Sequence, residues 1–190
     1  MKNFFLNSSE SKNFPLKKKI LGLCVTEGRY SIADLSRELN TSIPTTTKLV
    51  EELIEEGFLE DLGKLDTNGG RRPNIYGLKA SAGYFIGTDV RRHHVSIAIA
   101  DFRGDIVDYI DSIPFKVESS ADSFRNLCSI IKDNIRKFGI KEEEVLAYGL
   151  NLSGRVNNET GYCFTYFIGE DRPIASLMEE ELGGRVFVEN

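Results

Sequence analysis

The hydrophobic pattern changes its period once along this chain, and that change constrains the fold more than any other feature. Apolar residues recur at helical spacing as far as residue 57, whereas from residue 84 they form short strand-like segments separated by tight turns. Between the two regions lies Gly69-Gly-Arg-Arg-Pro73, a glycine turn with two arginines closed by a proline. The sequence therefore predicts a mobile tail over residues 1–13, one domain over 14–79 and another over 80–190.

The first domain reads as three short helices. Apolar spacing predicts helices over residues 15–27, 32–39 and 43–56. Ser31 and Ser42 precede the second and third, where a serine side chain can accept a hydrogen bond from a backbone N–H of the first turn. Gly28 and Gly57 end the first and third helices, because glycine tolerates the left-handed conformation that follows a helix.

Two strand-like segments follow the helices. Residues 58–60 and 74–78 flank a polar loop over 64–73 that carries Arg71 and Arg72 at its glycine turn. Three helices with a two-stranded ribbon make a winged helix-turn-helix, a DNA-binding arrangement. On this interpretation the outer face of the third helix meets base edges and phosphates, and the turn arginines meet a minor groove or phosphates. The predicted DNA-binding residues are Ser42, Thr45, Thr47, Lys48, Arg71 and Arg72.

The second domain is predicted to combine strands with helices. Strands are predicted over 84–90, 95–101 and 105–113, followed by a helix from 119 to 138, a strand over 145–152, a helix over 174–182 and a strand over 185–189. Three meander strands followed by alternating helices and strands predict a mixed sheet with covering helices. This is the element order of the ribonuclease-H-like lobe found in actin-like sugar kinases, so the fold class is α/β, and α+β overall.

Charge distribution and cysteine spacing bear on whether the chain can bind DNA or zinc. The net charge is -5, but residues 1–79 carry 12 basic against 11 acidic residues and residues 80–190 carry 12 against 18. The acidity therefore lies in the second domain, and the first can present a local basic face. Lys17, Lys18 and Lys19 are predicted to form a solvated helix face, with a phosphate contact as the alternative. The three cysteines have no zinc spacing, and no apolar run approaches the ~20 residues of a membrane span.

Five features, in their order along the chain, resemble the ROK family of repressors, open reading frames and kinases, and its transcriptional-repressor branch in particular. They are the helix-turn-helix, the Gly69–Pro73 turn, and the segments Ile86-Gly-Thr-Asp89, Gly149-Leu-Asn-Leu-Ser-Gly154 and Gly183–Asn190. The resemblance covers nearly all of residues 15–190. It implies a cytoplasmic repressor of carbohydrate-utilisation genes that responds to a sugar or sugar phosphate and forms homo-oligomers. It also implies that a full-length member continues past residue 190 into a zinc site and a second lobe, so we expect this chain to lack a C-terminal part.

The resemblance further assigns a sugar site to Ser153, Gly154 and Asn190. Sugar kinases of this fold hold nucleotide phosphates with Asp-x-Gly-x-Thr, where glycine lets the backbone approach the phosphates. This chain has Asp89-Val90-Arg91-Arg92-His93, with an arginine at the glycine position. We therefore expect no ATP binding, no metal or other cofactor, and no enzyme activity.

Two alternatives to a DNA-binding regulator stay open at this point. One is a ROK-type sugar kinase with an added N-terminal domain, and the other is a winged-helix module that binds protein. The paired glutamates at 51–52 and 55–56 favour the last, because an acidic face can dock a basic partner. The expected partners of the regulator are double-stranded DNA and a sugar effector, with no membrane.

Overall fold

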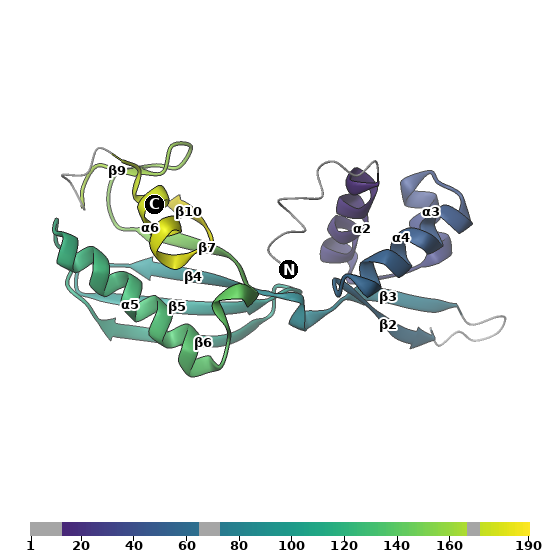
Figure 1. Ribbon diagram of the computed structural model, residues 1–190, viewed down its shortest axis with the longest axis horizontal. Coiled ribbons are helices and arrows are strands. Elements are labelled where there is room, and N and C mark those ends of the chain that lie inside the picture. The colour runs from purple at the N-terminus through teal and green to yellow at the C-terminus, as the bar shows by residue number, and fades with distance from the viewer. Residues whose placement is uncertain (1–12, 65–72, 167–171) are drawn as a thin grey trace. The chain divides into compact units, whose positions relative to one another are not determined.

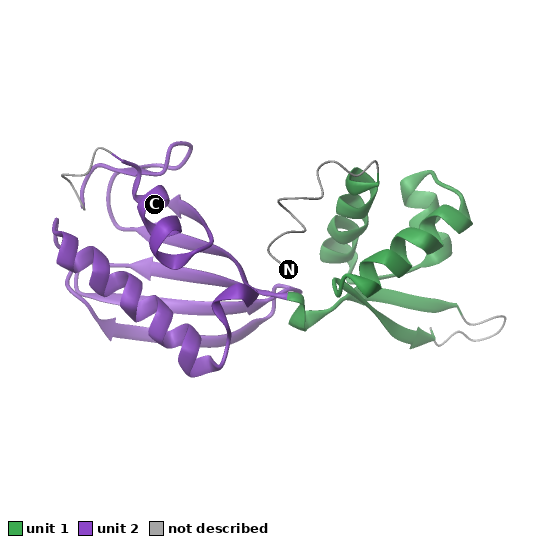
Figure 2. Ribbon diagram, viewed as in Figure 1, with its two compact units in different colours: residues 1–82 green, residues 83–190 purple. Residues whose placement is uncertain are grey.

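The computed structural model describes residues 13–64, 73–166 and 172–190. The chain divides into two compact units, Met1–Ala82 and Gly83–Asn190 (Figure 2). Both fold classes predicted from the sequence are confirmed: the first unit is a winged helix-turn-helix, and the second is a mixed sheet with helices. Apart from Asn13, the expected N-terminal tail lies outside the described residues.

Three helices form the body of the first unit: α2 (Phe14–Glu27), α3 (Ile32–Leu39) and α4 (Ile43–Glu55). Both predicted serine N-caps are present. Ser31 Oγ accepts a hydrogen bond from the Asp34 backbone N–H at 3.2 Å, and Ser42 Oγ accepts one from the Thr45 N–H at 3.3 Å. Between α3 and α4, Asn40 adopts a left-handed conformation with φ of 53° that turns the chain sharply.

The ribbon of the first unit has three strands, not the two predicted. β1 (Arg29–Ser31), β2 (Leu59–Lys64) and β3 (Asn74–Leu78) form an antiparallel sheet in the order β1-β3-β2. The prediction missed β1 because three residues are too few to show alternation. It also ended the second strand too early, at residue 60, because Gly63 resembles a loop residue but lies within a strand irregularity.

The three helices and the ribbon strands of the first unit pack against one another. Five of the apolar residues in this core are at most 1% exposed: Ile20, Leu35, Leu49, Leu53 and Phe58. They come from α2, α3, α4 and the segment before β2, so the orientation of α4 is fixed by the core and not by its own propensity.

The second unit is built on a five-stranded mixed sheet (Figure 1). Its strands are β4 (Tyr84–Val90), β5 (His94–Asp101), β6 (Ile106–Pro114), β7 (Val145–Leu152) and β10 (Arg185–Glu189), in the order β10-β7-β4-β5-β6. β4, β5 and β6 are antiparallel neighbours, whereas β7 is parallel to both β4 and β10. The antiparallel meander and the mixed sheet were predicted, whereas the strand order comes from the structure.

Two helices, α5 (Ala121–Phe138) and α6 (Ile174–Leu182), bury their apolar sides in one cluster with side chains from the sheet. Short 3-10 turns occur at Ala80–Ala82 and Glu142–Glu144. The sequence analysis missed a small hairpin formed by β8 (Val156–Asn157) and β9 (Tyr162–Cys163). Within the described residues, no helix is long and apolar enough to cross a membrane.

Candidate nucleic-acid interface and effector site

The start of α4 presents the predicted hydroxyl groups in an ordered arrangement. Ser42 and Thr45 are exposed, and their side-chain oxygens lie 2.8 Å apart in a hydrogen bond. Thr47 is half-buried, and its hydroxyl donates to the Ile43 carbonyl at 2.9 Å, so its lone pairs remain available to a donor. Thr46, which faces inward, is fully buried and donates to the Ser42 carbonyl.

Lys48 lies one turn further along α4 with 74% of its side chain exposed. Its ammonium is 3.9 Å from the Glu52 carboxylate, and a surface pair at that distance holds a lysine only weakly. Four of the six predicted DNA-contacting residues therefore lie together over the first turns of one helix. The other two, Arg71 and Arg72, lie outside the described residues.

Lys17 corrects the prediction of a solvated lysine face on α2. The residue is 7% exposed, and its ammonium lies 2.8 Å from Glu52 and 2.6 Å from Glu56 on α4. Burial lowers the pKa of Lys17, but the hydrogen bonds and charges of the two glutamates outweigh burial, so the pKa is raised. Lys19 donates to the Glu38 carbonyl at 2.7 Å. Of the three lysines, Lys17 therefore joins α2 to α4 and is not a candidate for contact with phosphate.

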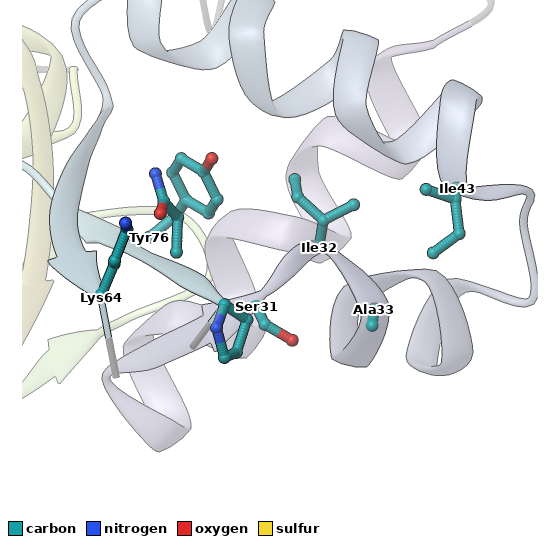
Figure 3. A pocket seen from close by; sticks show the side chains of 8 residues that line it. Ser31, Ile32, Ala33, Ile43, Lys64 and Tyr76 are labelled. Carbon is teal, nitrogen blue, oxygen red and sulfur yellow. The ribbon is translucent and has the colours of Figure 1, made fainter. Parts of the chain in front are cut away.

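A hollow that the sequence analysis did not anticipate lies between the first residues of α3 and α4 and the ribbon (Figure 3). Its volume is about 820 Å³. Side chains from α3, α4 and the ribbon strands line it, as Figure 3 shows for Ile32, Ile43, Lys64 and Tyr76. The remaining lining residues are Ser31, Ala33, Pro73 and Asn74. No local pattern predicts this hollow, because its walls are brought together by the register of the sheet.

In the second unit, the three predicted sugar-site residues come together at the carboxyl ends of the strands. The side-chain amide of Asn190 donates to the Gly154 carbonyl. The backbone N–H and the hydroxyl of Ser153 both lie 3.2 Å from the Val90 carbonyl. A Cβ on Gly154 would come within 2.8 Å of the Thr165 Cβ, so only glycine fits the observed loop. Ligands of open α/β sheets bind at this edge.

Asp89 occupies the adjacent strand end and is held from two sides. Asn151 Nδ2 donates to one of its carboxylate oxygens and Arg91 Nε to the other, both at 2.8 Å. The hydrogen bond and charge of Asp89 raise the pKa of Arg91. The arginine at the phosphate-loop glycine position thus folds back on the aspartate. Among the described residues, no group of three or more His, Cys, Asp or Glu is placed to hold a metal ion.

The two units therefore define a winged-helix domain followed by a lobe of ribonuclease-H-like element order. A family model described as a winged helix-turn-helix DNA-binding domain matches residues 15–60. The putative xylose repressor of Caldicellulosiruptor sp. (strain Rt8B.4) is 24% identical over 177 residues, which are 92% of this chain and 44% of that protein. The xylose repressor of Bacillus subtilis (strain 168) is 24% identical over 176 residues, 92% of this chain and 45% of that protein.

The fold has a solved counterpart. The crystal structure of a ROK family transcriptional regulator, a homologue of the E. coli MLC protein, superimposes with a TM-score of 0.68 at 18% identity, over 92% of this chain and 44% of that one. The predicted resemblance to the repressor branch of the ROK family is confirmed by these comparisons. The chain spans less than half the length of the relatives it matches.

Proposed function

We propose that this chain is the DNA-binding and effector-sensing part of a transcriptional repressor of carbohydrate-utilisation genes. The observation that carries the proposal is the first turn of α4, where Ser42 and Thr45 are exposed side by side on a helix fixed by the core of a winged-helix unit. The xylose repressors whose sequences align with 92% of the chain support it. They also support the expectation that the chain is not an enzyme.

DNA binding would use α4 as the recognition helix. Its amino-terminal turn carries the positive end of the helix dipole and the hydroxyl groups, which suit phosphates and base edges in a major groove. Lys48 adds one cation on the same helix. The resemblance to ROK repressors implies that the protein forms homo-oligomers. We therefore propose that two copies bind a palindromic operator in the cytoplasm.

The rival interpretation as a protein-docking module loses its main support. It rested on the acidic pairs at 51–52 and 55–56. Glu52 and Glu56 both pair with the single ammonium of Lys17, so these two carboxylates are engaged within the domain and one of the four negative charges is neutralised there. The remaining pair, Glu51 and Glu55, is exposed, but two carboxylates on one helix are an ordinary solvated surface.

Effector sensing would use the strand ends of the second unit. Asn190 and Ser153 carry hydrogen-bonding groups suited to sugar hydroxyls, and Gly154 lets the loop between them pack against Thr165. We propose a pentose or hexose as the effector, with xylose as the first candidate because of the names of the relatives. A sugar can change DNA affinity only by binding two arrangements of the protein with different affinity. The Arg91–Asp89 contact supports the proposal that ATP is not bound.

A selection from a pool of random duplexes tests the proposal. The chain is incubated with the pool at two salt concentrations, and bound duplexes are sequenced. A palindromic consensus whose affinity falls steeply with salt supports operator binding. A folded, dimeric protein that retains no duplex at low salt would overturn it. Adding xylose to the bound complex then reports whether the sugar changes affinity.

A further inference from the structure

One arginine next to the proposed effector site is held by an aromatic ring and not by a carboxylate. Arg155 directly follows Gly154, whose carbonyl accepts the Asn190 amide. The guanidinium carbon of Arg155 lies 5.3 Å from the centroid of the Phe164 ring, and within the described residues it forms no ion pair. Several other arginines of the second unit do pair with carboxylates: Arg91, Arg125, Arg136 and Arg172.

The β8–β9 hairpin fixes both partners of this contact. The Phe164 backbone N–H donates to the Arg155 carbonyl at 2.8 Å, and the Arg155 N–H donates to the Thr165 hydroxyl at 2.7 Å. Val156 and Cys163, which pair with each other in the hairpin, pack against the core of the unit. Because side chains alternate along a strand, Arg155 and Phe164 lie on the other face, where both are exposed, Phe164 to 48%.

A contact with a ring leaves the hydrogen-bonding capacity of a guanidinium available. The ring attracts the cation through its π face and takes none of the strong hydrogen bonds that a carboxylate would accept. The Phe164 ring also stacks with Tyr162, with 6.4 Å between centroids, which limits where the ring can lie. Arg155 is therefore a positioned cation with free N–H donors. The fork of donors on a guanidinium matches two oxygens of a carboxylate or a phosphate.

We propose that Arg155 binds an anionic group on the effector, so that the site prefers a sugar carrying a phosphate or a carboxylate to the same sugar without it. The proposal rests on the proposed effector site and names the chemical class of its ligand. Asn190 and Ser153 would hold sugar hydroxyls, and Arg155, one residue beyond the Gly154 carbonyl, would pair with the anion. Arg155 is then a specificity-determining residue of the site.

The acidity of the second unit does not exclude an anion at this place. Residues 80–190 carry 12 basic against 18 acidic residues, but the two carboxylates that follow from the strand ends already have partners. Asp89 is paired with Arg91, and the Glu189 carboxylate lies 3.4 Å from the Asn158 amide nitrogen. The Arg155 guanidinium therefore has no competing carboxylate among these.

Calorimetry with matched sugars at constant ionic strength tests the proposal. One series is xylose, xylose 5-phosphate and xylonate, and the other is glucose, glucose 6-phosphate and glucuronate. In at least one series an anionic member should bind the wild type about tenfold more tightly than its neutral parent, because hydrogen bonds to charged groups are the stronger ones. The member that shows the preference distinguishes phosphate from carboxylate. Arg155→Gln should abolish the preference and leave the affinity for the neutral sugar unchanged.

Arg185→Gln is the matched control. The Arg185 guanidinium carbon also lies over a phenylalanine ring, 5.8 Å from the Phe187 centroid, but Arg185 begins β10, at the opposite end of that strand from Asn190. Its loss changes the net charge equally and should leave the preference intact.

Three results would contradict the assignment of Arg155. A wild type that binds the neutral sugars as tightly as the anionic ones, a preference that persists in Arg155→Gln, or an equal loss in Arg185→Gln would each overturn it and leave the proposed effector site intact. A folded wild type that binds no member of either series would overturn the assignment and the proposed effector site together.

Discussion

Lys17 on α2 and Glu56 on α4 form an ion pair with 2.6 Å between ammonium and carboxylate. The same ammonium lies 2.8 Å from Glu52, so one lysine bridges Glu52 on α4 and Glu56 at the carboxyl-terminal cap of that helix. This bridge ties α2 to the carboxyl-terminal half of α4. At the amino-terminal end of α4, Ser42 and Thr45 remain exposed.

Replacing Lys17 should destabilise the first unit. Lys17→Ala leaves two partly exposed carboxylates without their cation and is expected to cost about 1–3 kcal/mol in unfolding free energy, less than a fully buried pair would. Lys17→Met, which keeps the packing, should cost less. Denaturant unfolding of the three proteins measures both. Equal stability of Lys17→Ala and wild type would show that the pair does not clamp the helices.

The pH dependence of the same pair has a defined sign. The pKa of Lys17 is raised in the folded protein, so its stabilising contribution is fully present below the unfolded-state lysine pKa of about 10.4 and is lost as pH rises through the folded value. The stability difference between wild type and Lys17→Met should be constant from pH 7 to pH 9 with respect to lysine titration and shrink above about pH 10.4. A difference that grows with alkaline pH would contradict the assignment.

Two substitutions at Ser42 should affect protein stability and DNA affinity differently. Ser42→Ala removes the N-cap of α4 and should cost about 1 kcal/mol of stability. Ser42→Asp keeps a capping oxygen and interacts well with the helix dipole, so it should preserve stability. However, the added negative charge at the proposed DNA face should weaken duplex binding more than Ser42→Ala does. Thermal unfolding and anisotropy on the same samples give both quantities, and duplex affinity undiminished in Ser42→Asp would remove this turn from the interface.

Gly154→Ala should impair the effector site. The added Cβ would lie 2.8 Å from the Thr165 Cβ, so the loop carrying the acceptor of Asn190 must move. We expect xylose affinity, measured by calorimetry, to fall about tenfold, which corresponds to 1.4 kcal/mol. Gly149→Ala is the control, because a Cβ there meets no atom within 4 Å. If the two alanine variants bind xylose equally, the loop does not shape the site.

Titration with Mg-ATP tests the altered phosphate loop. Arg91 occupies the position where a glycine would let a phosphate approach, and its guanidinium is bound to Asp89. Calorimetry should therefore detect no saturable binding at millimolar nucleotide. Saturable heat from the wild type that disappears in Asp89→Asn would contradict the account and revive the kinase interpretation.

Local features of the sequence predicted most of the fold. Ser31, Ser42 and Gly28 act on their own helix ends, so the cap positions could be predicted from a few neighbouring residues. β1 and the β8–β9 hairpin were missed because strands of two or three residues show no alternation. In the site, the grouping of Ser153, Gly154 and Asn190 was anticipated by resemblance alone.

Long-range pairing explains what the sequence did not predict. Lys17 looked solvated because its partners are 35 and 39 residues away, and helical spacing cannot reveal a contact between helices. The face of the ribbon on which Lys64 lies depends on one extra residue in β2. That extra residue is recognised only when β2 is paired with β3. The hollow that Lys64 lines likewise exists only once β2, β3, α3 and α4 have assembled.

The central claim, that α4 reads the operator, is tested most directly by repeating the duplex selection with Thr45→Ala and Lys48→Ala. The account predicts that each variant still selects a palindrome. It also predicts that base preference is lost at symmetry-related positions for Thr45→Ala, whereas Lys48→Ala lowers affinity or relaxes neighbouring positions. An identical consensus at undiminished affinity for both variants would show that DNA recognition lies elsewhere in the protein.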